Sequence, residues 1–143
     1  MTSPSIVALH VGQPQALGAL GPEDPFGEPW PTEGERWTSG IFKVPVEGPV
    51  SLTARGFDGD GQADVVKHGG LDKAVCAYPA DHYPEWRRTL GITPFDFGAF
   101  GENLTIDGLD EQTVCIGDVW SLVDAQVQVS VPRSPCWKLA RRW

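Results

Sequence analysis

Apolar and polar residues alternate along several short stretches of this chain, which is the pattern of half-buried β-strands. The clearest stretch is 125–131, in which every second residue is Ala or Val. One face of a strand at 126–131 is therefore expected to be buried. Runs of β-branched and other apolar residues, bounded by Gly and Pro, predict further strands. They cover residues 5–11, 41–46, 50–55, 74–78, 104–106 and 119–123.

Two stretches carry the signals of helix ends. Asp81 is a capping residue for a helix that ends before Gly91, and Pro84 lies in its first turn. A second helix is predicted near the end of the sequence, where Ser134 is a good N-cap and Pro135 suits the first helical position. Helices are therefore expected to be few and short.

Many short strands with Gly/Pro turns and few helices favour a mainly β fold. We expect a closed or nearly closed β-barrel with a few short helices. The length of 143 residues fits a single domain over residues 1–143. Residues 12–40 are crowded with Pro, Gly and acidic side chains, so they predict a long loop.

The charge of the chain argues against general nucleic-acid binding. Eleven basic and 19 acidic side chains give a formal net charge of −8, which repels phosphate backbones. A small anionic ligand stays compatible with this charge, because one pocket needs only a few cations.

Cysteine usage and hydropathy predict a cytoplasmic protein without a membrane partner. The three cysteines are an odd number and are widely spaced, which disfavours a disulfide framework and a zinc finger. No apolar run approaches the roughly 20 residues needed to cross a bilayer, and residues 1–11 lack a basic leader.

Cys136 is the strongest candidate for chemistry. It follows Ser134 and Pro135, so it falls at a predicted helix N-terminus, where the helix dipole favours a thiolate. Arg133 and Lys138 add positive charge nearby. A thiolate attacks electrophiles or binds a soft metal. The alternative is a buried cysteine that packs as a small hydrophobe.

A glycine-rich loop supplies a second candidate. Gly69 and Gly70 allow the backbone to approach a ligand closely, and Lys67, His68 and Lys73 can neutralise an anion. The same residues are also compatible with a plain hairpin turn that carries solvated lysines.

Polar residues before residue 104 allow more than one interpretation. Asn103 offers a donor and an acceptor to a ligand, or bonds its own backbone in a turn. Glu102 either pairs with Arg133 or faces water. His10 and His82 lack the spacing of a metal site, so both are interpreted as structural.

Several short motifs follow one another along the chain. They are Gly59-Asp60-Gly61-Gln62-Ala63-Asp64, Lys67-His68-Gly69-Gly70, Tyr78-Pro79-Ala80-Asp81-His82-Tyr83, Phe100-Gly101-Glu102-Asn103-Leu104, Ile116-Gly117-Asp118 and Pro132-Arg133-Ser134-Pro135-Cys136-Trp137-Lys138-Leu139. In their order and spacing these motifs resemble the MOSC domain family (molybdenum cofactor sulfurase C-terminal-like), and the closest likeness is to its YiiM-like bacterial branch. The resemblance covers most of the chain from about Ile41 onward.

The resemblance implies a MOSC-type β-barrel that binds the molybdenum cofactor, molybdopterin, with Cys136 as the protein ligand to the metal. The resemblance also implies pyridoxal phosphate binding. The residues expected to surround the cofactor are Lys67, His68, Gly69, Gly70, Lys73, Asn103, Ser130 and Arg133.

The resemblance also implies an activity. Relatives of this kind reduce N-hydroxylated compounds, such as hydroxylamino-purines and amidoximes, with electrons from flavin and iron–sulfur partners. Cys136 and His68 are then the catalytic candidates, and Asp118 is a second proton donor to consider. The alternatives are a persulfide carrier that uses Cys136, a cofactor-handling protein and a noncatalytic binding module.

YiiM-like chains continue beyond the barrel into a helical C-terminal part. We therefore expect this chain to lack that extension, as a fragment or as a shortened member. Trp143 is then expected to expose apolar surface, through which the chain self-associates.

Overall fold

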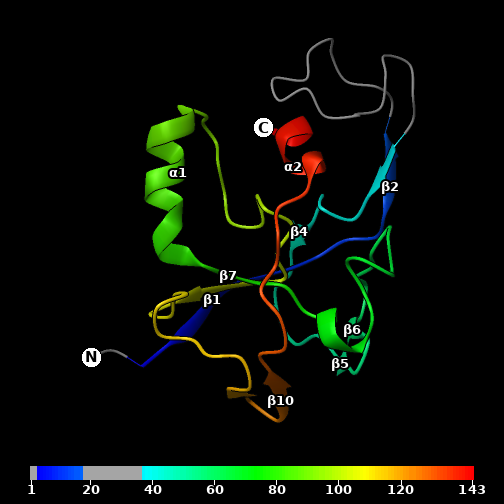
Figure 1. Ribbon diagram of the computed structural model, residues 1–143, viewed down its shortest axis with the longest axis vertical. Coiled ribbons are helices and arrows are strands. Elements are labelled where there is room, and N and C mark those ends of the chain that lie inside the picture. The colour runs from blue at the N-terminus through cyan, green and yellow to red at the C-terminus, as the bar shows by residue number, and fades with distance from the viewer. Residues whose placement is uncertain (1–2, 18–36) are drawn as a thin grey trace.

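The computed structural model describes residues 3–17 and 37–143. Its largest sheet has four strands in the order β4-β1-β8-β7 (Figure 1). The central strands are β1 (Ser5–Val11) and β8 (Leu104–Asp107), which pair antiparallel. At the edges, β4 (Val44–Pro45) pairs antiparallel with β1, and β7 (Ala77–Pro79) pairs parallel with β8. This sheet brings together four segments spread between residues 5 and 107.

The remaining strands form three antiparallel pairs. They are β2 (Gln15–Leu17) with β3 (Trp37–Ser39), β5 (Leu52–Thr53) with β6 (Gly56–Phe57), and β9 (Val119–Leu122) with β10 (Ala125–Gln128). The protein is therefore mainly β with few short helices, as predicted. Among the described residues the hydrogen-bonded pairing does not close into a barrel, and the closed barrel stays a prediction.

Several strands differ from their predicted bounds. The strands expected at 41–46 and 50–55 shrink to two residues each and pair with β1 and β6, not with one another. Pro45 and Pro49 lack the N–H that a longer ladder needs. The loop predicted over 12–40 is wrong at β2 and β3, and its residues 18–36 lie outside the described part.

The first predicted helix is confirmed, with a different start. A 3₁₀ turn, η2 (Ala80–His82), precedes α1 (Tyr83–Leu90), so His82 and not Asp81 is the N-cap. Gly91 closes the helix at φ 64°, where glycine avoids the left-handed strain of other residues.

The second predicted helix begins later than expected. Cys136 is the N-cap of α2 (Trp137–Arg142), so the prediction that Ser134 caps it is wrong. Cys136 itself has extended backbone, with φ −114° and ψ 162°, so the helical conformation begins only at Trp137. Another short 3₁₀ turn, η1 (Leu71–Lys73), ends the glycine-rich loop.

Two apolar clusters pack on the large sheet. One is centred on Phe57, Leu104 and Ile106, and the other on Tyr83, Phe95 and Ala99. Trp143 joins the second cluster: its ring centroid lies 4.7 Å from that of Phe95, and its Nε1 donates to the Ala99 carbonyl at 2.8 Å. The expectation that Trp143 exposes apolar surface is therefore wrong, because this cluster half-buries it.

A buried carboxylate ties the second cluster to the sheet. The side chain of Glu102 is fully buried and accepts hydrogen bonds from Tyr83 Oη, the Gly98 and Phe100 backbone amides, and Thr105 Oγ1. Neither of the predicted alternatives, pairing with Arg133 or facing water, applies. Burial and the neighbouring Glu102 charge raise the pKa of Tyr83, so its hydroxyl stays a donor at neutral pH.

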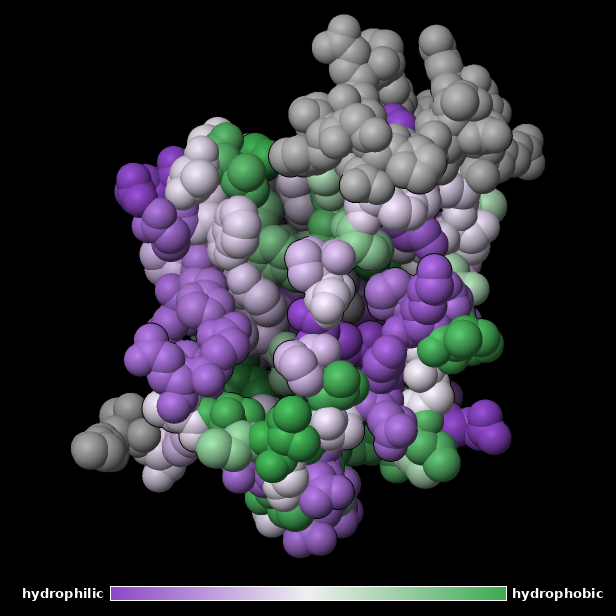
Figure 2. All heavy atoms as spheres, viewed as in Figure 1, coloured by the Kyte–Doolittle hydropathy of each residue, from purple (hydrophilic) through white to green (hydrophobic). Residues whose placement is uncertain are grey.

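The surface carries scattered apolar residues. Figure 2 shows hydrophobic residues gathered at the end of the molecule that carries the β9–β10 hairpin, where Val119 and Val123 are exposed. No helix of the described residues is long and apolar enough to cross a membrane.

The tip of the β9–β10 hairpin is strained. Val123 has φ 54° and a fully exposed side chain, and it occupies a two-residue turn in which Leu122 pairs with Ala125. A β-branched residue in this region costs about 1–2 kcal/mol, and hairpin turns with positive φ at their first central position favour glycine.

Val123→Gly is therefore expected to stabilise the protein by about 1 kcal/mol, since relief of the strain outweighs the added freedom of the unfolded chain. Thermal unfolding measures this. The matched control is Val119→Gly at an exposed strand position, which should destabilise by about 0.5–1 kcal/mol. Equal unfolding temperatures for the two variants would contradict the strain argument.

Candidate functional site

A cavity of about 370 Å³ lies between the glycine-rich loop and the segment that leads into α2. These two segments run side by side in Figure 1 although they are far apart in sequence. The volume is within the usual range for small-molecule sites. Its lining consists of Lys67, His68, Lys73, Val131, Pro132, Arg133, Ser134, Pro135 and Cys136. The cavity therefore joins the two segments from which the sequence predicted chemistry.

Hydrogen bonds to backbone carbonyls fasten the two segments together. Arg133 donates from Nη1 to the His68 carbonyl at 3.3 Å and from Nη2 to the Lys73 carbonyl at 2.8 Å. Ser130 Oγ donates to the Asp72 carbonyl at 2.5 Å. Within the loop, Lys73 Nζ donates to the Lys67 carbonyl at 2.7 Å. Arg133, Ser130 and Lys73 thus shape the wall of the cavity.

Lys67 and His68 are the cationic or titratable side chains that remain for a ligand. Among residues 3–17 and 37–143, the Lys67 ammonium makes no hydrogen bond or ion pair, and its side chain is exposed. Burial lowers the pKa of His68, and the neighbouring Arg133 lowers it further. His68 is therefore mainly neutral at pH 7, which leaves Lys67 as an available positive charge of the cavity wall.

The two loop glycines are required by the backbone conformation and the packing of the loop. A Cβ on buried Gly69 would lie 3.0 Å from Val65 Cα, and Gly70 has φ 89°, which favours glycine. Asp64 Oδ1 accepts the Val66 and Lys67 amides and turns the chain before them. Neither glycine is part of the cavity lining, so their contact with a ligand stays a prediction.

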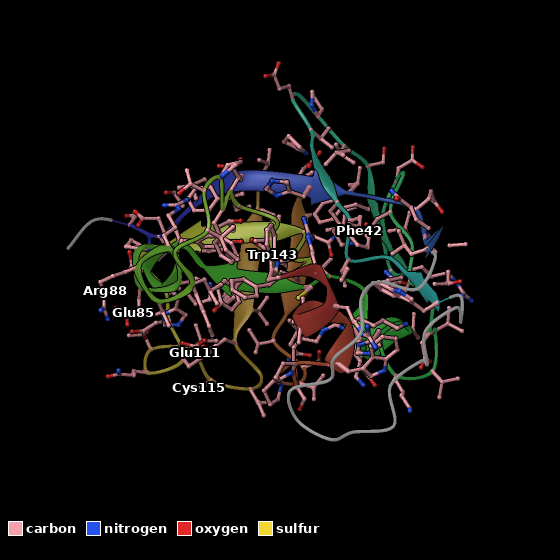
Figure 3. All side chains as sticks on the ribbon, turned by 90° about the horizontal axis from the view of Figure 1, so that it is seen from above. Phe42, Glu85, Arg88, Glu111, Cys115 and Trp143 are labelled. Carbon is pink, nitrogen blue, oxygen red and sulfur yellow. The ribbon has the colours of Figure 1, made fainter. Side chains whose placement is uncertain are left out.

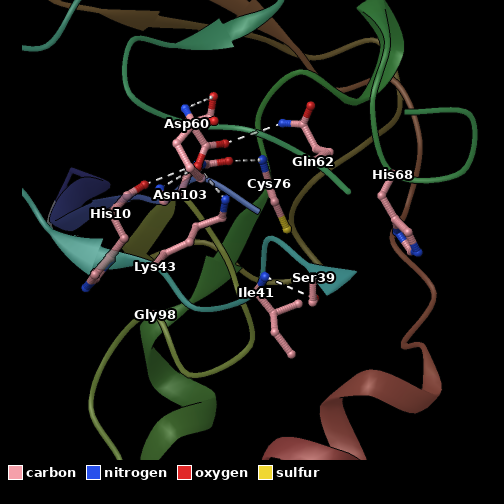
Figure 4. Close-up of polar contacts among 12 residues, drawn as sticks. His10, Ser39, Ile41, Lys43, Asp60, Gln62, His68, Cys76, Gly98 and Asn103 are labelled. Atoms are coloured by element: carbon pink, nitrogen blue, oxygen red, sulfur yellow. Dashed lines mark hydrogen bonds and ion pairs between the residues drawn. The ribbon is translucent and has the colours of Figure 1, made fainter. Parts of the chain in front are cut away.

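Asn103 lies apart from the cavity, inside the large sheet. Its Oδ1 accepts the Cys76 amide at 3.0 Å and its Nδ2 donates to the His10 carbonyl at 3.1 Å. Figure 4 shows this group around Asn103, with His68 on a separate loop. The buried amide thus joins β1 to the chain before β7, and this geometry does not support its predicted contact with a cofactor.

The histidines and the aspartate outside the cavity have structural contacts. His82 Nε2 lies 2.8 Å from Glu111 Oε2. His10 is buried, its Nδ1 has no hydrogen-bond partner among the described residues, and burial lowers its pKa. Asp118 Oδ2 accepts the Cys115 amide, so this carboxylate closes a turn outside the cavity lining.

Cys136 differs from the other cysteines in its surroundings. It is half-buried, it opens on the cavity and its side chain does not cap α2. Cys76 is also half-buried, but it lies outside the cavity lining, and burial raises the pKa of its thiol. Cys115 is exposed on the edge of the molecule, away from α2 (Figure 3). Among the described residues, no group of three His, Cys, Asp or Glu side chains could hold a metal ion on its own.

The side chains around the cavity fit a soft metal that brings its own anionic organic ligand. Cys136 supplies one soft donor, Lys67 supplies a free positive charge, and the loop carbonyls are already engaged. The sequence interpretation missed the apolar side of the lining, formed by Val131, Pro132 and Pro135. Their position directly before Cys136 was the available signal.

The MOSC domain family model matches residues 64–143. YflK of Bacillus subtilis is 48% identical over 139 residues, which cover 97% of this chain and 57% of that protein. A Gibberella moniliformis protein named "Reductase" is 43% identical over 113 residues, 77% of this chain and 20% of its own length. The crystal structure of YiiM from Geobacillus stearothermophilus superposes with a TM-score of 0.67 at 36% identity, covering 98% of this chain and 56% of that one.

The chain spans about half the length of YflK and of the Geobacillus YiiM. The family match contains both cavity segments, from the loop with Lys67 to Cys136. Similarity to YiiM in sequence and in structure agrees with the motifs quoted above. The chain belongs to the MOSC domain family and is YiiM-like.

Proposed function

We propose that this protein is a molybdenum-cofactor-dependent oxidoreductase that reduces N-hydroxylated compounds of the hydroxylamino-purine or amidoxime type. One observation carries the proposal: the Cys136 thiol opens on the same cavity as the neutral His68 and the Lys67 ammonium, which is unpaired among the described residues. A thiolate suits a soft metal, and a nearby ammonium suits the phosphate of a pterin.

The bound cofactor would supply two-electron chemistry. Removing the oxygen of an N-hydroxyl group as water consumes two electrons and two protons. In this protein Cys136 holds the metal, Lys67 attracts the anionic part of the cofactor, and His68 transfers protons at the cavity wall. Because its pKa is lowered, the His68 imidazole is neutral at pH 7, so it would act there as a proton acceptor and relay, not as a store of protons.

The relatives support the proposed reaction class, a reduction, more than they support the proposed substrate. The Gibberella relative is named "Reductase", and the matching region is a fifth of that protein. Electrons are proposed to come from a flavin or iron–sulfur partner, because the cavity segments supply no redox group besides the cysteine. The closed barrel, a single MOSC domain over 1–143, pyridoxal phosphate binding and self-association stay predictions.

A persulfide carrier is the second candidate function. The observation that favours it is the partial exposure of Cys136 in an open cavity beside Lys67, which would let a sulfur donor reach the thiol. Such a carrier would hold cyanide-labile sulfur on Cys136 without stoichiometric molybdenum. A noncatalytic module would instead bind metal and pterin and show no turnover with a competent electron donor.

Cys136→Ala is expected to abolish molybdenum binding, because it removes the soft donor of the cavity. Wild type and variant are expressed in a cofactor-producing host, and metal content and pterin fluorescence are measured. Cys115→Ala is the matched control, since that thiol is exposed outside the cavity. Wild type without molybdenum but with cyanide-labile sulfur would favour the carrier.

Lys67→Ala is expected to weaken pterin retention by about tenfold, equivalent to about 1.4 kcal/mol, and to leave thermal stability unchanged. Lys73→Ala should instead lower stability by about 0.5–1.5 kcal/mol, because it removes the hydrogen bond to the Lys67 carbonyl. Pterin fluorescence and thermal unfolding of both variants separate the two roles. Equal pterin loss at equal stability would contradict this division.

Binding of a small anion is expected to strengthen as pH falls from about 8 to about 5. Inorganic sulfate is the probe, because it keeps its charge over this range. The pKa of His68 is lowered, so the side chain is neutral at pH 7 and gains positive charge only on acidification. His68→Gln should flatten the pH dependence of the sulfate dissociation constant, and His82→Gln should not. An unchanged slope in His68→Gln would contradict the assignment.

A further inference from the structure

We propose that Arg142 is a positioning residue for Cys136. By joining the last turn of α2 to two separate backbone segments, Arg142 holds the helix that begins at Cys136 in place. The functional importance of this position rests on the proposed role of Cys136 as a metal ligand. The positioning itself concerns only residues of this chain.

The helix α2 cannot hold its place by its own stability. It has six residues, and isolated helices shorter than about 12–15 residues are marginal in water. Its position must therefore come from tertiary contacts. At its start, the Trp137 ring lies 5.5 Å from the Trp37 ring, and Lys138 Nζ donates to the Thr38 carbonyl at 2.7 Å. Both contacts reach the chain at β3.

At the other end of α2, Arg142 makes a more extensive contact. Its Nη1 donates to the Ile41 carbonyl at 2.5 Å and to the Gly98 carbonyl at 3.2 Å. The guanidinium also lies 5.1 Å from the Phe42 ring and 4.9 Å from the Trp143 ring, and Figure 3 shows these two rings beside the end of α2. One side chain thus joins three parts of the chain.

The Arg142 contact leads directly into the core. Gly98 donates its amide to Glu102 while its carbonyl accepts from Arg142. Burial lowers the pKa of Arg142, and the Glu102 charge opposes that shift, so the buried carboxylate stabilises the guanidinium. The position of α2 is therefore coupled to the fully buried carboxylate of Glu102.

An arginine anchors the chain on each side of Cys136. Arg133, which precedes the cysteine, donates to the His68 and Lys73 carbonyls. Arg142, which follows it, donates to two other carbonyls. A six-residue helix is only about 9 Å long and moves as one rigid piece, so loosening its end at Arg142 also loosens its start at Cys136. A displacement of about 1 Å at a reactive group can cost about 10²-fold in rate. Arg142 thus acts on the position of Cys136 through the short helix α2.

The test measures the alkylation of Cys136 by iodoacetamide in metal-free protein, across pH, with modification of each cysteine quantified by peptide mass spectrometry. In Arg142→Ala, the Cys136 rate should rise at least about threefold with a changed pH profile, since the loosened helix opens more often. The exposed Cys115 is the internal reference and should react as in wild type. Arg142→Lys, which keeps the charge and a donor, should restore part of the protection.

Arg88→Ala is the matched control, because Arg88 is an exposed cation whose ion pair with Glu85 lies on α1. Its Cys136 alkylation should equal that of wild type. An unchanged Cys136 rate and pH profile in folded Arg142→Ala would overturn the inference. If that variant does not fold, wild-type behaviour of Arg142→Lys in both rate and pH profile would overturn it instead.

The alkylation experiment and the molybdenum measurement can fail independently. Absence of molybdenum from the wild-type protein would refute the cofactor role and leave the alkylation result intact. Normal molybdenum content together with unchanged alkylation in the Arg142 variants would refute the positioning role alone.

Discussion

The carboxylate of Glu102 accepts four hydrogen bonds in a site closed to solvent, and the arrangement of the second apolar cluster depends on them. Its donors come from α1, from the loop after Phe97 and from β8. Each donor left unpaired in such a site costs about 1–3 kcal/mol, so the loop has little freedom to adopt another shape. The carbonyls of the same loop accept from Arg142 and Trp143. The carboxylate therefore influences the helix that carries Cys136 without touching it.

The candidate site is built largely from backbone. Arg133 and Lys73, which composition would assign to an anion, direct their donors to carbonyls of the glycine-rich loop. Carbonyls are permanent partners that do not depend on a ligand, so the cavity wall is organised in advance. This leaves Lys67 as an unpaired ammonium among the described residues and His68 as a neutral group at pH 7. A chain with a formal net charge of −8 can thus present a site for a small anion without a general affinity for polyanions.

Residues of the motifs that indicate the family have separate roles in this fold. Asn103 and Cys136 both belong to the motifs that indicate the family, yet Asn103 binds the backbone of His10 and Cys76 inside the sheet. Cys136 opens on the cavity. The difference lies in their positions: Asn103 lies between β1 and the chain before β7, whereas Cys136 lies at the start of α2. Motifs common to a family therefore include residues that maintain the sheet as well as residues that contact a ligand.

Much of the secondary structure was predictable, because strands such as β1, β8 and β9 carry their own apolar pattern and α1 carries its own end signals. The cavity segments and Cys136 were also predictable, since Pro135, the loop glycines and the flanking cations are local features. The burial of Glu102, the helix start at Cys136 and the carbonyl contacts of Arg133 and Arg142 were not. These depend on segments tens of residues apart being brought together, and no local pattern specifies which carbonyl a distant arginine will meet. The sequence alone thus determined the main elements and pointed to Cys136 as the candidate for chemistry, whereas tertiary packing decided which polar groups support the fold and which remain available to a ligand.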